Sequence, residues 1–230
     1  MTGQPPARRA YDTSGRRASA ARNRQAVLAA CHEILLREGY QETTIRAVAE
    51  LAGVSPELVY KAFGSKQALM KAVYDAVLAG DDEPVPIGQR PAIRRIWAIA
   101  DPGEKVRAYA GFVTGLNQRL GGLAAVLAES DPEVAQVREV TEDERLEGLR
   151  AFTDHLAAGG WLAAGDARQA ADECWVLTSP AVYARLTIAR QWSASAYQDW
   201  LARMLAAALL SRGLPEPVVV EPQVHRGQVK

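Results

Sequence analysis

One stretch near the N-terminus constrains the fold of this chain more than any other. Residues 43–66 read TTIRAVAELAGVSPELVYKAFGSK, in which apolar residues recur at helical spacing on both sides of Gly53. After that glycine, Ser55 can accept a hydrogen bond from a free N–H of the first helical turn, and Pro56 has no N–H to leave unpaired. The stretch therefore predicts two short helices joined by a turn tight enough to require glycine.

The flanking residues predict further helices around this pair. Residues 20–38 form an amphipathic pattern that ends at Gly39, and residues 65–79 form a second one. Thr43 or Thr44 can cap the helix that precedes Gly53. The whole segment is typical of a helix-turn-helix.

The rest of the chain also predicts helices. Residues 80–91 contain three prolines and two glycines, which break regular structure and mark a boundary. No strand pattern of convincing length and no internal repeat occurs, so we expect an all-α fold. The expected divisions are a flexible basic arm (1–19), a helix-turn-helix domain (20–66) with a connecting helix (65–79), a larger helical domain (80–210) and a loose C-terminal tail (211–230).

The charge of the chain is balanced overall but unevenly distributed. Because 27 Lys and Arg residues match 27 Asp and Glu residues, a uniformly basic nucleic-acid-binding surface is excluded. DNA binding would therefore depend on local asymmetry. Such asymmetry exists before the first helix, where Asp12 is the single acid among Arg8, Arg9, Arg16, Arg17, Arg22 and Arg24. This arm can add salt-sensitive affinity for DNA, or it can be a solubilising tail.

The sequence indicates a cytoplasmic protein, associated with the nucleoid when bound to DNA. No apolar run reaches the roughly 18 residues that a membrane span needs. The arginine-rich N-terminus also lacks the apolar centre of a secretory signal.

No pattern of catalytic or metal-binding residues occurs. The two cysteines lie far apart and show no CxxC or Cys/His spacing, which gives little support to a disulfide or a zinc site. His32, His155 and His225 are scattered, and no metalloprotease motif, nucleophile elbow or phosphate-binding glycine loop is present. We therefore expect no cofactor, no metal and no enzymatic activity.

The run from Arg22 to Leu69 resembles the tetracycline-repressor (TetR) family of bacterial regulators. The shared features follow in order: a glycine–aromatic pair at 39–40, TTIRAVAELAGVS at 43–55, and LVYKAFGSKQAL at 58–69. Two later segments, LTSPAVYARL and WSASAYQDWLARML, look like the last two helices of actinobacterial-type members. The resemblance implies a homodimer with an N-terminal DNA-binding domain of three helices. It also implies a variable ligand-binding domain whose last two helices form the dimer interface.

In a helix-turn-helix the second helix enters the major groove of DNA while neighbouring groups hold phosphates. Arg46 is the preferred base reader, because its guanidinium can bind guanine in bidentate fashion, although pairing with Glu50 is the alternative. Tyr60 and Lys66 occupy positions that bind phosphate in similar proteins. The full set expected at DNA is Thr44, Arg46, Ser55, Pro56, Glu57, Tyr60, Lys61, Lys66 and Arg22.

The reading surface also departs from the family pattern. Leu58 and Ala62 stand where a threonine and a histidine or tyrosine often help to hold phosphate, so fewer backbone contacts should form. Glu57 is unfavourable near phosphate unless it accepts a hydrogen bond from a cytosine amino group or swings aside.

The larger domain is rich in aromatic residues that can line an apolar pocket with a few polar groups. Ordinary core packing is the alternative for each of them, and the family resemblance favours a pocket for the group. The candidates are Trp97, Tyr109, Phe112, Leu116, Asn117, Phe152, His155, Trp175 and Tyr183.

The alanine-rich helices expected at about 168–190 and 195–210 allow close approach of a second copy, and the last one carries a wide apolar face. We therefore expect a homodimer through these two helices. The predicted function is a ligand-responsive transcriptional repressor that binds a pseudo-palindromic DNA operator and is released by a small apolar or amphipathic effector. The alternatives are a dimeric DNA-binding protein without an effector and, ranked far below, an all-helical enzyme.

Overall fold

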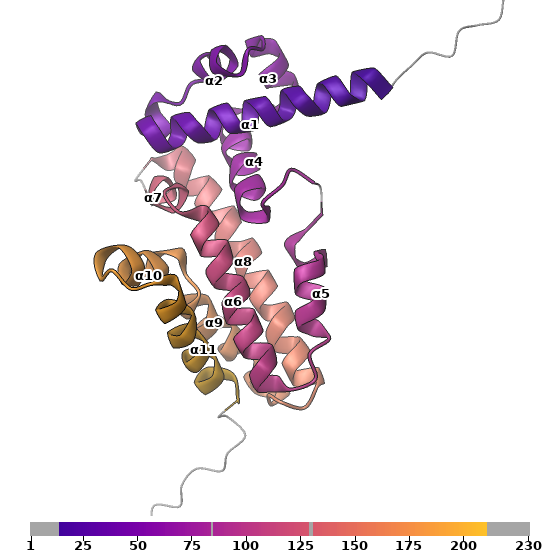
Figure 1. Ribbon diagram of the computed structural model, residues 1–230, viewed down its shortest axis with the longest axis vertical. Coiled ribbons are helices and arrows are strands. Elements are labelled where there is room, and N and C mark those ends of the chain that lie inside the picture. The colour runs from indigo at the N-terminus through magenta and orange to yellow at the C-terminus, as the bar shows by residue number, and fades with distance from the viewer. Residues whose placement is uncertain (1–13, 84, 129–130, 211–230) are drawn as a thin grey trace, which may run out of the picture.

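The computed structural model describes residues 14–83, 85–128 and 131–210, and every regular element in these ranges is helical (Figure 1). The all-α prediction is therefore confirmed. The α-helices are α1 (Ser14–Glu42), α2 (Ile45–Ala52), α3 (Pro56–Phe63), α4 (Lys66–Ala79), α5 (Pro91–Trp97), α6 (Pro102–Leu120), α7 (Leu123–Leu127), α8 (Pro132–Ala158), α9 (Ala167–Leu177), α10 (Pro180–Ala184) and α11 (Ala194–Leu210). Short 3-10 turns occupy Ile87–Gln89 (η1) and Ala164–Asp166 (η2), and a π-helical turn, η3, occupies Arg185–Ala189.

The predicted helix-turn-helix is confirmed down to its capping bonds. The Thr44 hydroxyl accepts a hydrogen bond from the Ala47 N–H at 3.1 Å, and the Ser55 hydroxyl accepts one from the Leu58 N–H at 3.3 Å. Gly53 has φ 66° and ψ 33°, a left-handed conformation that glycine adopts without the penalty of a Cβ atom. These local signals set the ends of both helices.

The first helix is longer than predicted at its N-terminal end. It begins at Ser14, so residues 14–19, expected in the flexible arm, are helical. Alanines and arginines in this part of the chain are good helix formers, which explains the extension. Gly39, with φ 82° and ψ −179°, leaves the helical conformation, so the regular helix is interrupted there as predicted and a short helical stretch follows the kink up to Glu42. The predictions for residues 1–13 of the arm and for the tail at 211–230 lie outside the described residues.

The helices form two regions that meet along the long axis of the molecule. At one end, α2 and α3 lie across α1, and α4 leads from them toward α6 and α8 (Figure 1). At the other end, α9, α10 and α11 lie on one side of α6 and α8, and α5 lies on the other (Figure 1). The element expected to read DNA is thus remote from the last helices.

Two apolar cores correspond to these regions, but they do not divide the chain at residue 80. The first core contains side chains of α1 to α4 together with Leu120, Leu123 and Val134 from α6, α7 and α8. The second core is built from α5, α6, α8, α9 and α11. The helix-turn-helix therefore rests on parts of the larger helical region as well as on its own helices.

The last helix buries its apolar face within its own chain. Tyr197, Leu201, Leu205 and Leu209 of α11 are fully buried, and α11 packs on α6 and α9. The expectation that this whole face is available to a second copy is therefore wrong for these four residues. The reason is that α6 and α9 together offer a groove wide enough to cover them.

In the ranges that the structure describes, no helix is long and apolar enough to cross a membrane. Cys31 and Cys174 are both buried and free. Burial raises the pKa of the Cys31 thiol to about 12.

Candidate functional site

The exposed face of α2 and α3 is set by the residues that this pair buries. Val48 and Val59 are completely buried, and Ile45 is nearly so, because all three pack into the first core. Residues on the opposite side of each helix must then point away from the protein. This outward side, at one end of the molecule, is the candidate nucleic-acid interface (Figure 1).

Four of the side chains expected at DNA lie on this outward side. Arg46, Glu57, Tyr60 and Lys61 are exposed, and Tyr60 exposes 55% of its surface. No ion pair involving Arg46 or Glu50 occurs in the described part of the chain, which leaves the Arg46 guanidinium unpaired within the protein. The proposed base reader therefore projects from α2 without a competing carboxylate.

The start of α3 carries a negative charge. The pKa of Glu57 is lowered because its carboxylate is hydrogen-bonded by its own backbone N–H and by the Ser55 hydroxyl. Pro56 is half-buried at the first helical position. Glu57 is therefore ionised at neutral pH, and it faces the side from which phosphates would approach.

Lys66 is held in place by a residue of the core. Its Nζ lies 3.8 Å from the centroid of the Tyr40 ring and 3.5 Å from the Gln41 carbonyl oxygen. The Tyr40 hydroxyl in turn donates a hydrogen bond of 2.6 Å to the Glu133 carboxylate on α8, and burial, followed by Glu133, raises the pKa of Tyr40. The cation at the start of α4 is thus fixed beside the helix-turn-helix.

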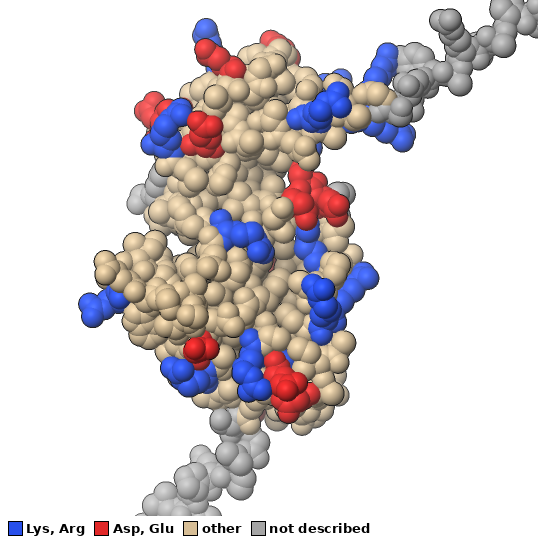
Figure 2. All heavy atoms as spheres, in the orientation of Figure 1, with Lys and Arg blue, Asp and Glu red and all other residues tan. Residues whose placement is uncertain are grey.

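Basic side chains continue from this surface along α1. Arg16, Arg17 and Arg22 are exposed on α1, and Figure 2 shows Lys and Arg side chains gathered along the free part of that helix. Since the arginines from position 16 onward belong to an ordered helix, they present charge at fixed positions.

A large cavity of about 1150 Å³ lies beneath α1, between α4, α5, α6 and α8. Its apolar end contains a stack of Tyr109 on Phe152, with ring centroids 3.9 Å apart, and the edge of Trp97 against Phe152 at 6.2 Å. Six of the nine candidate pocket residues line the cavity: Trp97, Tyr109, Phe112, Leu116, Asn117 and Phe152.

The other three candidates lie away from the cavity lining. His155 contacts Lys105, with 2.6 Å between Nε2 and Nζ. Trp175 on α9 is 36% exposed and lies under the Arg145 guanidinium, and Tyr183 packs edge-on against Tyr197. The helical pattern identified these residues as inward-facing aromatics but could not say which space they face.

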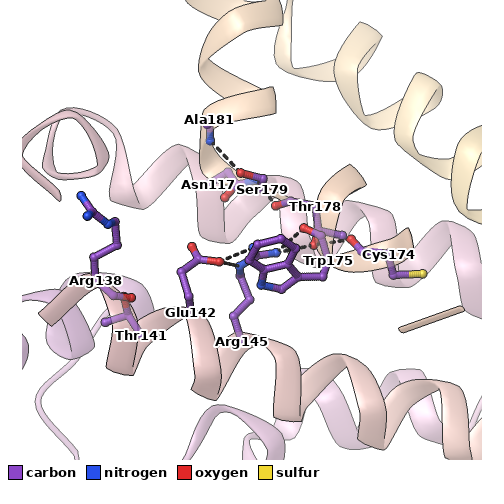
Figure 3. Close-up of polar contacts among 10 residues, drawn as sticks. All are labelled: Asn117, Arg138, Thr141, Glu142, Arg145, Cys174, Trp175, Thr178, Ser179 and Ala181. Carbon is purple, nitrogen blue, oxygen red and sulfur yellow. Dashed lines mark hydrogen bonds and ion pairs between the residues drawn. The ribbon is translucent and has the colours of Figure 1, made fainter. Parts of the chain in front are cut away.

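A polar network beside the cavity involves residues that sequence reasoning missed. Arg145 of α8 donates hydrogen bonds to the Trp175 carbonyl at 2.7 Å and to the Thr178 hydroxyl at 3.0 Å, and it also pairs with Glu142 (Figure 3). Asn117 of α6 donates to the Thr178 carbonyl at 3.2 Å. The break between α9 and α10 is therefore held by two polar side chains that also line the cavity.

A buried lysine near the apolar end was also missed. Lys105 exposes 1% of its surface and donates to the Trp97 carbonyl at 3.1 Å, with Nζ 4.5 Å from the Trp161 ring centroid. Burial lowers the pKa of Lys105. Its histidine and backbone partners are remote in sequence, so no local pattern signals this cluster.

Comparisons with known proteins agree with this architecture. Residues 27–73, which cover α2, α3 and parts of α1 and α4, match the family described as "Bacterial regulatory proteins, tetR family". This segment of the chain is therefore similar to the N-terminal part of TetR-family regulators. A search of curated protein sequences gave no significant match.

Three solved structures show how far the likeness of the fold extends beyond this segment. A structure from Syntrophomonas wolfei described as a TetR-family transcriptional regulator has a TM-score of 0.67 at 16% identity, covering 86% of this chain and 98% of that one. FadR from Bacillus subtilis, in complex with stearoyl-CoA, has a TM-score of 0.62 at 18% identity, covering 80% and 98%. NalD from Pseudomonas aeruginosa, the secondary repressor of the MexAB-OprM multidrug efflux pump, has a TM-score of 0.61 at 18% identity, covering 85% and 100%. At these identities the likeness shows a shared fold over nearly the whole described chain.

Among the described residues, no group of three or more His, Cys, Asp or Glu side chains is placed to hold a metal ion.

Proposed function

We propose that this protein is a homodimeric repressor of the TetR type that binds a pseudo-palindromic operator in the cytoplasm and is released by a small amphipathic effector. The observation that carries the proposal is the position of the large cavity. The cavity is lined by α1 and α4, the two helices on which α2 and α3 are mounted. A molecule in the cavity would therefore touch the support of the DNA-reading surface.

In the proposed complex, α3 lies in the major groove. Arg46 would read a base edge from α2, and Tyr60 and Lys66 would hold phosphates. Thr44 and Ser55 hold the helix starts in place, and the exposed arginines of α1 would add affinity that does not depend on sequence.

The proposed effector has a long apolar part and a polar head. Its apolar part would lie against the aromatic residues of the lining, and its head would lie among the charged residues that also line the cavity. The cavity volume slightly exceeds the usual range for small-molecule sites, roughly 300–1,000 Å³, which supports an extended ligand. FadR from Bacillus subtilis, which shares this fold, holds stearoyl-CoA. A solid bundle without an effector is disfavoured by a cavity of this size.

The proposed dimer uses the outer face of the C-terminal helices. Val176 on α9 exposes 56% of its surface, Ile188 on η3 exposes 70%, and Trp192 exposes 37%. All three belong to the C-terminal helices and the turn between them, and exposed large apolar side chains are typical of interaction sites. Two-fold symmetry would then place two copies of α3 in successive major grooves.

Effector binding would act through population shift. An effector that fits the cavity better when α4 is displaced would favour a dimer whose two copies of α3 no longer match the operator spacing. The polar network around Arg145 joins the cavity to α9 and α10, so the same ligand would also be sensed near the proposed dimer surface.

The test is fluorescence anisotropy with labelled DNA from the promoter region of the gene itself. Arg46→Ala and Tyr60→Ala are each expected to weaken binding by about tenfold, the value of one good polar contact to DNA. Arg94→Ala on α5, an exposed arginine outside α2, α3 and the C-terminal helices, is the control that should bind normally. Unchanged binding of both variants would remove the proposed surface.

A further inference from the structure

The lining of the cavity contains more carboxylates than cations. Four cations belong to the lining, and they are Arg24, Lys71, Arg90 and Arg145. The six carboxylates of the lining are Asp75, Asp81, Asp82, Glu83, Glu144 and Glu147. Figure 2 shows acidic side chains gathered on the surface between α1 and α5.

Each of the four cations already has a carboxylate partner. The pairs are Arg24 with Asp82 at 2.8 Å, Arg90 with Asp81 at 2.6 Å, Lys71 with Asp75 at 2.7 Å and with Glu144 at 2.9 Å, and Arg145 with Glu142. The side chains of Arg90 and Arg145 are only 13% and 17% exposed, so these pairs are partly shielded from water. No cation of the lining is therefore left to receive an anionic ligand.

Two carboxylates of the lining lack such a partner. Glu83, in the connection after α4, and Glu147, on α8, are exposed and make no ion pair with other described residues. A ligand with a carboxylate or phosphate head would have to break an existing pair or sit near these two charges. A ligand with a cationic head would find both available.

The aromatic residues of the lining are suited to the rest of such a ligand. Tyr109, Phe112 and Phe152 present aromatic surface to an alkyl chain, and aromatic faces also attract quaternary ammonium groups. We propose that the effector cavity is selective for cationic amphiphiles, molecules with an alkyl or aryl body and an ammonium head. This inference rests on the proposed role of the cavity as an effector site and adds the chemical class of the effector.

The test compares three probes with the same ten-carbon chain: decyltrimethylammonium, decanol and decanoate. Each is titrated into the full-length protein below its critical micelle concentration, with the dissociation constant taken from calorimetry and the melting temperature as a second readout. We expect decyltrimethylammonium to bind best and decanoate worst. The dissociation constant of decyltrimethylammonium should be about three- to tenfold lower than that of decanol. The difference is modest because the ion pairs of its head with Glu83 and Glu147 would be partly solvated.

The double variant Glu83→Gln/Glu147→Gln tests the origin of that preference. It should bind decyltrimethylammonium only as well as decanol, while its affinity for decanol stays the same. Glu139→Gln, which removes an exposed carboxylate of α8 outside the cavity lining, is the matched control and should retain the preference.

The other outcomes overturn the inference in distinguishable ways. Equal binding of the three probes, or a preference for decanoate, would refute the charge selectivity and leave the effector role intact. No binding of any probe would refute the effector role of the cavity and the inference with it.

Discussion

Gly53 and Gly148 are two glycines at which an added methyl group would meet no neighbouring atom within 4 Å. They differ in backbone conformation, since Gly53 has φ 66° after α2 and Gly148 lies inside α8. We predict that Gly53→Ala lowers the free energy of unfolding by about 1 kcal/mol, because alanine is strained in the left-handed region. Gly148→Ala should raise it by about 0.5–1 kcal/mol, because alanine is the better helix former.

Urea unfolding followed by circular dichroism measures both changes. The two variants control for each other, since the same substitution of glycine by alanine is expected to change the free energy of unfolding in opposite directions. A loss of stability in Gly148→Ala would mean that this part of α8 needs glycine for a reason other than helix geometry.

His155 should make the protein less stable in mild acid. Its pKa lies below the ordinary 6.5, first because of burial and then because of the neighbouring Lys105 cation. As the pH falls below 6.5, the unfolded chain binds a proton at this site while the folded protein resists it, so stability decreases as the pH falls. We predict that His155→Gln, which keeps an acceptor for Lys105 but does not titrate, loses less melting temperature between pH 7.5 and pH 5.5 than the original protein.

Thermal unfolding at several pH values, followed by circular dichroism, tests this prediction. Acid titration of carboxylates is common to both proteins and cancels in the comparison. Identical pH profiles would show that the contact between His155 and Lys105 does not govern the pKa of the histidine.

Residues whose partners are near in sequence could be predicted, and residues whose partners are distant could not. Thr44 and Ser55 cap helices through N–H groups three residues away, so their roles follow from local pattern. Lys105 contacts His155, which lies fifty residues away in the sequence, and Arg145 donates a hydrogen bond to Thr178, which lies thirty-three residues away. Only the packing of α6, α8 and α9 brings these groups together.

At the scale of elements, an ion pair joins α1, on which α2 and α3 pack, to the edge of the cavity. Arg24 of α1 binds Asp82 through Nε at 2.8 Å and Nη2 at 3.1 Å, and its guanidinium lies 4.7 Å from the centroid of the Phe63 ring at the end of α3. Because Arg24 contacts both α3 and the cavity edge, a displacement of the cavity edge can change the position of α3.

We predict a coupling free energy of about 0.5–1 kcal/mol between Arg24 and Asp82, because the pair is bidentate and partly buried. A double-mutant cycle with Arg24→Gln and Asp82→Asn, measured by urea unfolding, gives this value. The exposed pair of Arg37 and Glu33 on the same helix is the comparison and should show a smaller coupling. Equal couplings for the two pairs would remove the special role of Arg24.

The extents of the helices were less predictable than their caps. At the start of α8 the Asp131 carboxylate accepts hydrogen bonds from N–H groups of the first turn and Pro132 takes the first helical position, which is a local signal, whereas the full extent from Pro132 to Ala158 does not follow from local pattern. The first turns of α8 carry Val134 and Val137 into the core of the N-terminal region, whereas Leu149 and Phe152 enter the second core. Because α8 contributes side chains to two cores, its buried apolar residues do not follow one continuous helical stripe along its length.

At the scale of the whole molecule, the same ambiguity explains why the cavity was predicted only in part. An inward-facing aromatic residue obeys one helical period whether it meets another side chain or an empty space. Phe152 faces the cavity and His155, one turn later on α8, meets Lys105 instead. The difference depends on where α5 lies relative to α6 and α8, which no local pattern encodes.

The outer surface of the C-terminal helices is where assembly can be tested. Ile188 is the most exposed large apolar residue among the described ones, with 70% of its surface exposed. We predict that Ile188→Glu converts the dimer into a monomer, because a carboxylate buried at a two-fold interface would face its own symmetry mate without a partner. Sedimentation analysis at micromolar concentration would measure the change.

The operator affinity of the proposed dimer depends on its two linked copies of α3. With one α3 per particle, the second half-site no longer contributes, and operator affinity should fall by about tenfold or more. Val140→Glu on α8 is the matched control, since Val140 is 49% exposed but lies outside the predicted interface. If Ile188→Glu remained dimeric and bound the operator normally, the interface would have to lie on another face of the molecule, and the spacing of the two α3 helices would be set by different elements.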